Sequence, residues 1–145
     1  MSEINNAADV IDSRDVIERI EELQDERQAL ADELEEAEAD DDEAATATAQ
    51  AALQEWDGSE EGQELRALLA LQEEAEGYSD WRHGAALIRD SYFPDYARDL
   101  AEDLHGNKVR NAEWPFSHID WEAAAEALQV DYTAVEFDGV TYWVR

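Results

Sequence analysis

The spacing of apolar residues predicts a long helix over residues 14–43. Apolar side chains recur there at intervals of three and four, on one side of a helix: Val16, Ile20, Leu23, Leu30 and Leu34. Asp12 and Ser13 are good N-caps, and Asp15 lies near the positive end of the helix dipole. Arg27 interrupts the stripe, which spans only about three heptads. We therefore expect it to be covered by a second copy in a short coiled coil, or by the next helix in a helical hairpin.

Two shorter helices are predicted to follow. The four acidic residues at 40–43 oppose the dipole at the end of the first helix, so we expect a helix end or hinge there. Residues 44–56 are rich in Ala and Thr and indicate a second helix. A turn at residues 57–59 then provides Ser59 as the N-cap of a third helix, which ends at Gly77.

The chain after Gly77 begins with short helical patterns. An apolar run favours a helix over residues 81–89. A wide apolar stripe predicts another helix over residues 92–104, with Ser91 as its cap and Pro94 in its first turn. Residues 106–113 are predicted to be a polar loop.

A further helix is predicted to begin at Ser117. Ser117 would be its N-cap, and Asp120 would complete a capping box. Phe116 and Trp121 have the spacing of a hydrophobic staple across this start.

The last residues, 133–145, predict a β-hairpin. Asp138 and Gly139 form the dipeptide that favours a two-residue type I′ turn. Such a turn fixes the cross-strand pairs on the face expected to pack against the helices: Phe137 with Val140, and Val135 with Tyr142.

These elements predict a mostly helical α+β protein in two parts. Residues 1–76 would form an acidic helical arm, and residues 77–145 a compact helix-plus-hairpin domain. Of the five Trp only Trp56 precedes Gly77, and every Tyr and Phe follows it. Aromatic side chains bury the most area, so the second part has the material for a core.

Charge narrows the range of functions. The chain has 39 acidic and 10 basic residues, for a net charge of -29. Residues 1–76 carry 26 acidic and 4 basic residues, and residues 77–145 carry 13 and 6. Such a protein is repelled by phosphates, which argues against direct nucleic-acid binding and against docking on anionic membranes. The absence of cysteine, of a long apolar run and of a leader pattern leads us to expect a cytoplasmic protein.

Catalytic patterns are missing from the sequence, and we expect neither an enzyme, nor a metal, nor a cofactor. The three histidines are scattered, and no phosphate-binding loop, HExxH or GxSxG motif is present. Residues 40–43 lack the alternating ligands of a calcium loop. Four tryptophans offer either a ligand cage or core packing, and we expect core packing: Trp81, Trp114, Trp121 and Trp143.

The density of negative charge suggests mimicry of a nucleic acid. Residues 9–43 hold 17 acidic and 3 basic residues, a net charge of -14. If they were all helical, they would span roughly 50 Å at about 1.5 Å per residue. That corresponds to about one net charge per 3.7 Å, close to the roughly 3.4 Å between phosphates along one DNA strand. A basic groove built for DNA would gain counterion-release energy from such a helix.

The acidity also fits two roles that involve no mimicry. The composition of the chain, with many acidic residues and a single lysine, Lys108, is also typical of a protein adapted to a salt-rich cytoplasm. A charged helical arm can also serve as an assembly or adaptor module, holding its partner through the apolar residues Val16, Ile20, Leu23 and Leu30.

Residues 80–145 resemble a family of small proteins carried by phages, plasmids and integrated elements. The resemblance rests on HIDW, DYT and FDGVTYWVR, which occur in this order. Members of the family are described as antirestriction-type proteins. The resemblance implies a counter-defence protein in a bacterial host cell, of the class whose acidic members mimic DNA and block restriction or CRISPR nucleases. Pro94 stands where the family often has an acidic residue, the polar stretch 106–113 replaces a more apolar one, and residues 1–79 lie outside the match.

We therefore expect an inhibitor that occupies the nucleic-acid site of a host DNA-binding defence complex. We also consider a homodimer through the N-terminal helix. The carboxylates expected to replace phosphates are those of the arm, with a second face on the 92–104 helix: Asp15, Glu18, Glu21, Glu22, Asp25, Glu26, Asp32, Glu33, Glu35, Glu36, Glu38, Asp40, Asp41, Asp42, Glu43, Asp95, Asp99, Glu102 and Asp103.

Overall fold

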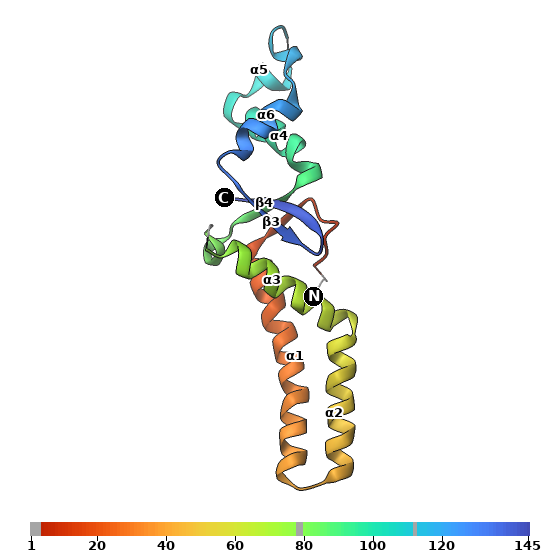
Figure 1. Cartoon of the computed structure of the whole chain (residues 1–145). Coiled ribbons are helices and arrows are strands. Elements are labelled where there is room, and N and C mark those ends of the chain that lie inside the picture. The colour runs from red at the N-terminus through yellow and green to blue at the C-terminus, as the bar shows by residue number, and fades with distance from the viewer. Residues whose placement is uncertain (1–3, 78–79, 112) are drawn as a thin grey trace.

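A four-stranded antiparallel sheet lies at the middle of an elongated molecule (Figure 1). This computed structural model describes residues 4–77, 80–111 and 113–145. A hairpin of two long helices projects from one side of the sheet, and a group of short helices covers the other (Figure 1). The α+β, mostly helical fold predicted from the sequence is confirmed.

The projecting hairpin consists of α1 (Ser13–Ala39) and α2 (Glu43–Gly58). Asp12 caps α1 by accepting a hydrogen bond from the Arg14 N–H at 2.9 Å. The predicted break after the first helix is confirmed: Asp41 has a φ of 54° there. Asp42 then caps α2 by accepting from the Ala45 N–H. The partner of α1 is thus the helix that follows it.

Helix α3 (Glu60–Ala75) turns away from α2 across the base of the hairpin (Figure 1). Ser59 is its N-cap, as predicted, and accepts from the Gly62 N–H at 3.3 Å. Gly62 lies so close to the end of α2 that a Cβ atom would come within 2.4 Å of the Asp57 carbonyl oxygen and 2.5 Å of the Trp56 carbonyl oxygen. The tight α2–α3 corner therefore requires glycine at this position.

The sheet has the strand order β1-β2-β4-β3. Its strands are β1 (Val10–Asp12), β2 (Ala86–Arg89), β3 (Thr133–Phe137) and β4 (Val140–Val144). The C-terminal hairpin has the predicted register, with Phe137 opposite Val140 and Val135 opposite Tyr142. Asp138 and Gly139 adopt the positive φ angles, 49° and 81°, that a type I′ turn requires.

The two faces of the sheet belong to different cores. Because side chains alternate along a strand, Leu87 and Tyr142 face α1 and α3, whereas Ile88 and Trp143 face the short helices. The larger core joins residues from both sides of Gly77, among them Leu23, Leu68 and Phe137. The base of the arm and the sheet therefore share one core.

The short helices beyond the sheet are α4 (Phe93–His105), α5 (Asn107–Arg110) and α6 (Trp121–Gln129). Pro94 lies in the first turn of α4 and Gly106 follows its end, as predicted. Tyr92 is the N-cap of α4, so the expected cap at Ser91 is wrong; a 3-10 turn, η2 (Asp90–Tyr92), occupies that position.

Three further expectations for this region are wrong. The helix expected over residues 81–89 is a 3-10 turn, η1 (Trp81–His83), followed by β2. Gly84, at a φ of 104°, ends the turn, and β2 pairs with both β1 and β4. The loop expected at residues 106–113 contains α5, which buries Val109. Helix α6 is capped by Asp120, not Ser117, which lies in another 3-10 turn, η3 (Phe116–His118).

The described residues contain no helix with the length and apolar character needed to cross a membrane.

Candidate partner-binding surface

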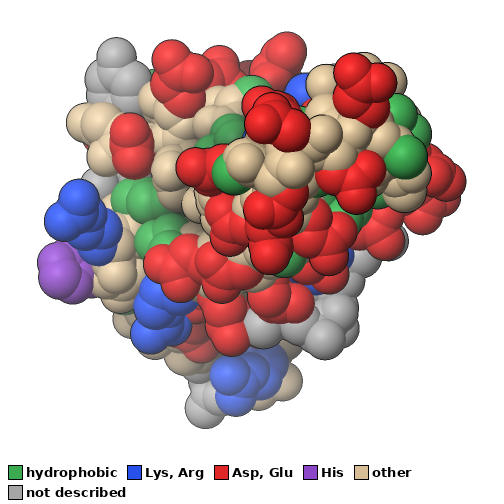
Figure 2. Space-filling view, turned by 90° about the horizontal axis from the view of Figure 1, so that it is seen from below, with side chains coloured by type: hydrophobic (Ala, Val, Ile, Leu, Met, Phe, Trp, Pro, Cys, Tyr) green, Lys and Arg blue, Asp and Glu red, His purple; other side chains and the backbone are tan. Residues whose placement is uncertain are grey.

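Helix α1 carries many exposed carboxylates outside its core contacts. At 100° per residue, half of these acidic positions lie opposite the buried side chains of Val16, Ile20 and Leu23, and most of the others lie on the two flanks of the helix. Acidic side chains crowd the arm end of the molecule in a view from below (Figure 2). We call the following exposed residues the acidic row: Asp15, Glu18, Glu21, Asp25, Glu26, Asp32, Glu33, Glu35, Glu36 and Glu38.

The three arginines of α1 leave this row without paired cations among the described residues. Arg14 pairs with Asp12, at 2.7 Å, and Arg27 pairs with Asp57 of α2, at 2.8 Å. The Arg27 guanidinium holds the pKa of Asp57 below its usual value, and Arg14 does the same for the pKa of Asp12. The ion pairs of Arg14 and Arg27 thus involve carboxylates outside the row, although Asp15 and Glu26 still interact electrostatically with Arg14 and Arg19.

Arg19 is directed into the base of the arm. Its guanidinium contacts Glu64 of α3 at 2.8 Å and Glu22 at 3.2 Å. Glu22 is half-buried, and its Oε2 atom has no hydrogen-bond partner among the described residues. The Glu22 side chain is 40% exposed but is engaged by Arg19, so we leave it out of the acidic row, and its expected role as a phosphate-mimicking carboxylate stays a prediction.

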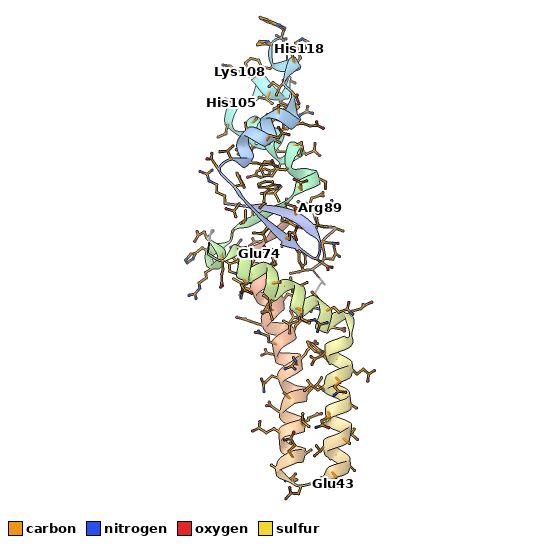
Figure 3. All side chains as sticks on the ribbon, viewed as in Figure 1. Glu43, Glu74, Arg89, His105, Lys108 and His118 are labelled. Carbon is orange, nitrogen blue, oxygen red and sulfur yellow. The ribbon has the colours of Figure 1, made fainter. Side chains whose placement is uncertain are left out.

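The acidic block at the tip ends the row instead of extending it. Asp40, Asp41, Asp42 and Glu43 are all exposed, but α1 stops at Ala39 and the chain reverses there. Figure 3 places Glu43 at the far end of the arm. The condition behind the estimate of roughly 50 Å, that all of residues 9–43 are helical, is therefore not met, because α1 covers only Ser13–Ala39. The 27 residues of α1 span about 40 Å, with four further acidic side chains gathered at the tip.

The acidic residues of α4 lie beyond the sheet, on the side opposite the arm (Figure 1). Asp95, Asp99 and Asp103 are exposed, whereas Glu102 is half-buried and lies 3.7 Å from Arg98. Asp99 accepts a hydrogen bond from the Tyr92 hydroxyl at 3.3 Å and raises the pKa of that phenol. The structure does not bring this second face together with the acidic row.

Helices α2 and α3 carry further exposed carboxylates that were not among the residues predicted from the sequence. They are Glu55, Glu60, Glu61, Glu73 and Glu74. The acidic residues of the helix predicted after Ser59 indicated that this helix is charged. They did not indicate that α3 crosses the base of the arm. Glu74 is partly engaged, because it accepts a hydrogen bond from the Glu136 N–H at 3.0 Å.

The histidines and tryptophans do not assemble into a site. His105 and His118 lie at the end of the molecule opposite Glu43 (Figure 3). The described residues contain no group of three His, Asp or Glu side chains placed to hold a metal ion. Trp81 is buried in the larger core and Trp143 packs against the smaller one. Trp114 is 79% exposed, so the expected core role is wrong for that residue.

Comparisons with protein-family models, with curated proteins and with solved structures found no match to this chain.

Proposed function

We propose that this chain is a counter-defence protein of a mobile element, which inhibits a host restriction or CRISPR complex by occupying its nucleic-acid site. The proposal rests on the acidic row, and the antirestriction-type resemblance of residues 80–145 supports it. The inhibitor needs no catalytic group of its own, because its action is to compete with DNA for a basic groove.

The spacing of unpaired carboxylates is the observation that carries the proposal. The ten carboxylates of the acidic row lie on a helix of 27 residues, about 40 Å long, which gives roughly one per 4 Å. Phosphates follow one another at about 3.4 Å along a DNA strand. Counted over all sides of α1, the carboxylates therefore reach a linear charge density similar to that of one DNA strand, and a basic groove that encloses the helix can bind them in place of phosphates.

The rigidity of α1 adds to this match. Its apolar stripe is buried against α2, α3 and the sheet, and its arginines hold it to α2 and α3. The carboxylates are thus held near one another before binding, which reduces the entropy lost on association.

The distribution of charge favours recognition over a general adaptation to salt. Helix α2 has 16 residues but only three acidic ones, Glu43, Glu55 and Asp57. Acidity spread for solubility alone would be expected on both helices of the hairpin, whereas here it is concentrated on α1.

An assembly module is the second candidate, and the sparsely charged α2 favours it. Three of the four apolar residues expected to hold the partner are not available, because Val16, Ile20 and Leu23 are at most 4% exposed. Assembly would therefore have to use the outer surface of α2 or the partly buried Leu30.

A pull-down from bacterial lysate with the tagged full chain separates the two candidates. A mimic should lose its partner when duplex DNA is added and when salt rises, because both compete for the same cations. An assembly module should keep its partner in both cases. Retention of every partner at saturating duplex DNA would contradict the proposed function.

A matched pair of variants then assigns the effect to the arm. Asp25→Asn, Asp32→Asn and Glu36→Gln together neutralise three charges on one side of α1. The control is a variant in which Asp95, Asp99 and Asp103 of α4 are neutralised, so that it loses the same number of charges as the arm variant. We expect the arm variant to bind roughly tenfold more weakly, from about 0.5 kcal/mol per exposed charge pair. The control should bind distinctly better than the arm variant.

A further inference from the structure

A shallow, widely open groove with an apolar floor lies between α1 and α2 near the α2–α3 corner. It has a volume of about 620 Å³. The apolar part of its lining comes from Ala29 and Leu30 of α1 and from Ala52 and Trp56 of α2. Leu30 and Trp56 are only partly buried, so both retain apolar surface that a partner can cover.

The floor of this groove is fixed by the fold. Trp56 packs against the larger core, and the close approach of Gly62 to the Trp56 carbonyl oxygen holds the corner beside it. On the same helices, the Arg27–Asp57 ion pair ties α1 to α2. The groove therefore exists before a partner arrives.

The rim of the groove is acidic. Glu26, Glu55 and Glu61 line it from three different helices, and all three are exposed. No ion pair engages any of them among residues 4–77, 80–111 and 113–145. An apolar floor beside three exposed carboxylates is complementary to an apolar side chain flanked by Lys or Arg.

We propose that this groove binds a cationic amphipathic helix of the partner protein, which packs its apolar residues over Leu30 and Trp56 while its Lys or Arg side chains meet the acidic rim. A third helix laid along a two-helix hairpin is an ordinary helix-in-groove arrangement. This groove proposal rests on the proposed function in one respect: the partner is taken to be the DNA-binding protein that the acidic row engages.

A second copy of this chain does not fit the groove. Each described helix of nine or more residues has more acidic than basic residues, so none offers a cationic face: α1, α2, α3, α4 and α6. Helix α5 has two basic residues, but it is only four residues long. The occupant must therefore come from a protein of opposite charge.

Two synthetic peptides test the groove without any host protein. One is an amphipathic Leu/Lys helix of about 14 residues, and the other replaces each Leu by Ala while keeping length and charge. Binding to the full chain is measured by calorimetry at about 0.15 M salt, where general electrostatic attraction is screened. We expect the Leu/Lys peptide to bind at least tenfold more tightly than the Ala/Lys peptide.

Variants locate that difference. Leu30→Ala removes part of the floor without changing charge, and Ala52→Phe fills the groove. Each variant should reduce the tenfold ratio of the affinities for the two peptides towards one. Leu104→Ala is the control, because it truncates a leucine of α4 that is 70% exposed and should leave this ratio unchanged. Circular dichroism shows which variants fold. If Leu30→Ala does not fold, Ala52→Phe alone is enough to test whether the groove causes the difference in affinity.

Three results would overturn the proposal. The first is equal affinity for the two peptides. The second is a ratio that persists in a folded groove variant. The third is a dimer in sedimentation analysis that Leu30→Ala dissociates, because a second copy would then be the occupant. These measurements contain no nucleic acid. A negative result for the groove therefore leaves the DNA-competition test of the proposed function unaffected.

Discussion

Arg19 of α1 and Glu64 of α3 form a two-pronged ion pair at the base of the arm. The Arg19 Nη2 atom lies 2.8 Å from Glu64 Oε1, and its Nε atom lies 2.9 Å from Oε2. Glu64 Oε2 also accepts a hydrogen bond from the Ile4 N–H at 3.1 Å. The side chains are only 12% and 6% exposed. This pair fixes the direction in which α1, and with it the acidic row, leaves the sheet.

Removing the arginine should destabilise the protein strongly. Arg19→Met leaves Glu64 and Glu22 close together without a cation between them. Breaking a buried ion pair costs about 3 kcal/mol of stability at the lower end of the usual range, which applies here because the site is partly open to solvent. Urea unfolding measures the loss. Arg14→Met serves as the control, because Arg14 is 65% exposed and its loss should shift the midpoint little. Equal midpoints for both variants would show that the Arg19 pair does not stabilise the arm.

Ser13 is expected to be essential for the junction between α1 and the sheet. Its buried hydroxyl donates to the Trp81 carbonyl oxygen at 2.7 Å and accepts from the Ala85 N–H at 2.7 Å. Ser13→Ala leaves both backbone groups unpaired, so the free energy of unfolding should fall by about 2 kcal/mol. Chemical denaturation tests this value. A loss below the error of the measurement would mean that these groups find other partners.

The start of α6 offers a direct contrast between two caps. Asp120 accepts hydrogen bonds from the Glu122 N–H at 3.1 Å and the Ala123 N–H at 3.2 Å. Asp120→Ala should therefore cost about 1 kcal/mol of stability, whereas Ser117→Ala should be nearly neutral. Thermal melts of the two variants compare them. The opposite order of stability would restore Ser117 as the cap.

Alkaline pH should weaken the packing of the short helices. Burial, together with the hydrogen bond to Tyr96, raises the pKa of Tyr132 to about 12, from 10.0. The folded protein therefore holds this proton more tightly than the unfolded chain. Its contribution to stability is complete below pH 10 and is lost as the pH rises towards 12.

A spectroscopic titration checks this assignment. Phenolate absorbance should show a tyrosine that ionises near pH 12, and Tyr132→Phe should remove that step. Tyr96→Phe is the companion variant, because it deletes the 3.0 Å hydroxyl contact and should lower the pKa of Tyr132 without removing the step. A titration curve unchanged by Tyr132→Phe would contradict the assignment.

Local patterns allowed several elements to be predicted from the sequence. The hairpin at residues 133–145 depends on turn chemistry at Asp138 and Gly139, which acts within a few residues. The cap at Ser59 is equally local. Residues 81–89 were misassigned because a short apolar run fits a helix or a strand, and the choice is made by pairing with β1, more than 70 residues away.

The candidate surface was predicted only in part. The carboxylates of α1 followed from composition and spacing, because a helix exposes the positions that its apolar stripe does not use. The pairing of Arg19 with Glu64, 45 residues away, and the groove beside Trp56 are products of tertiary packing. The narrow stripe of α1 did not distinguish between α2 and a second copy; within the chain α2 packs against α1, and the homodimer stays a prediction.

Displacement of DNA is the most direct measurement of the central claim. The partner recovered from lysate is loaded with a fluorescently labelled DNA duplex, and the chain is added while anisotropy is recorded. We predict that the duplex is released as the chain binds, and that the variant lacking Asp25, Asp32 and Glu36 carboxylates needs roughly tenfold more protein for the same release. A ternary complex, with the duplex still bound while the chain is in place, would contradict the account.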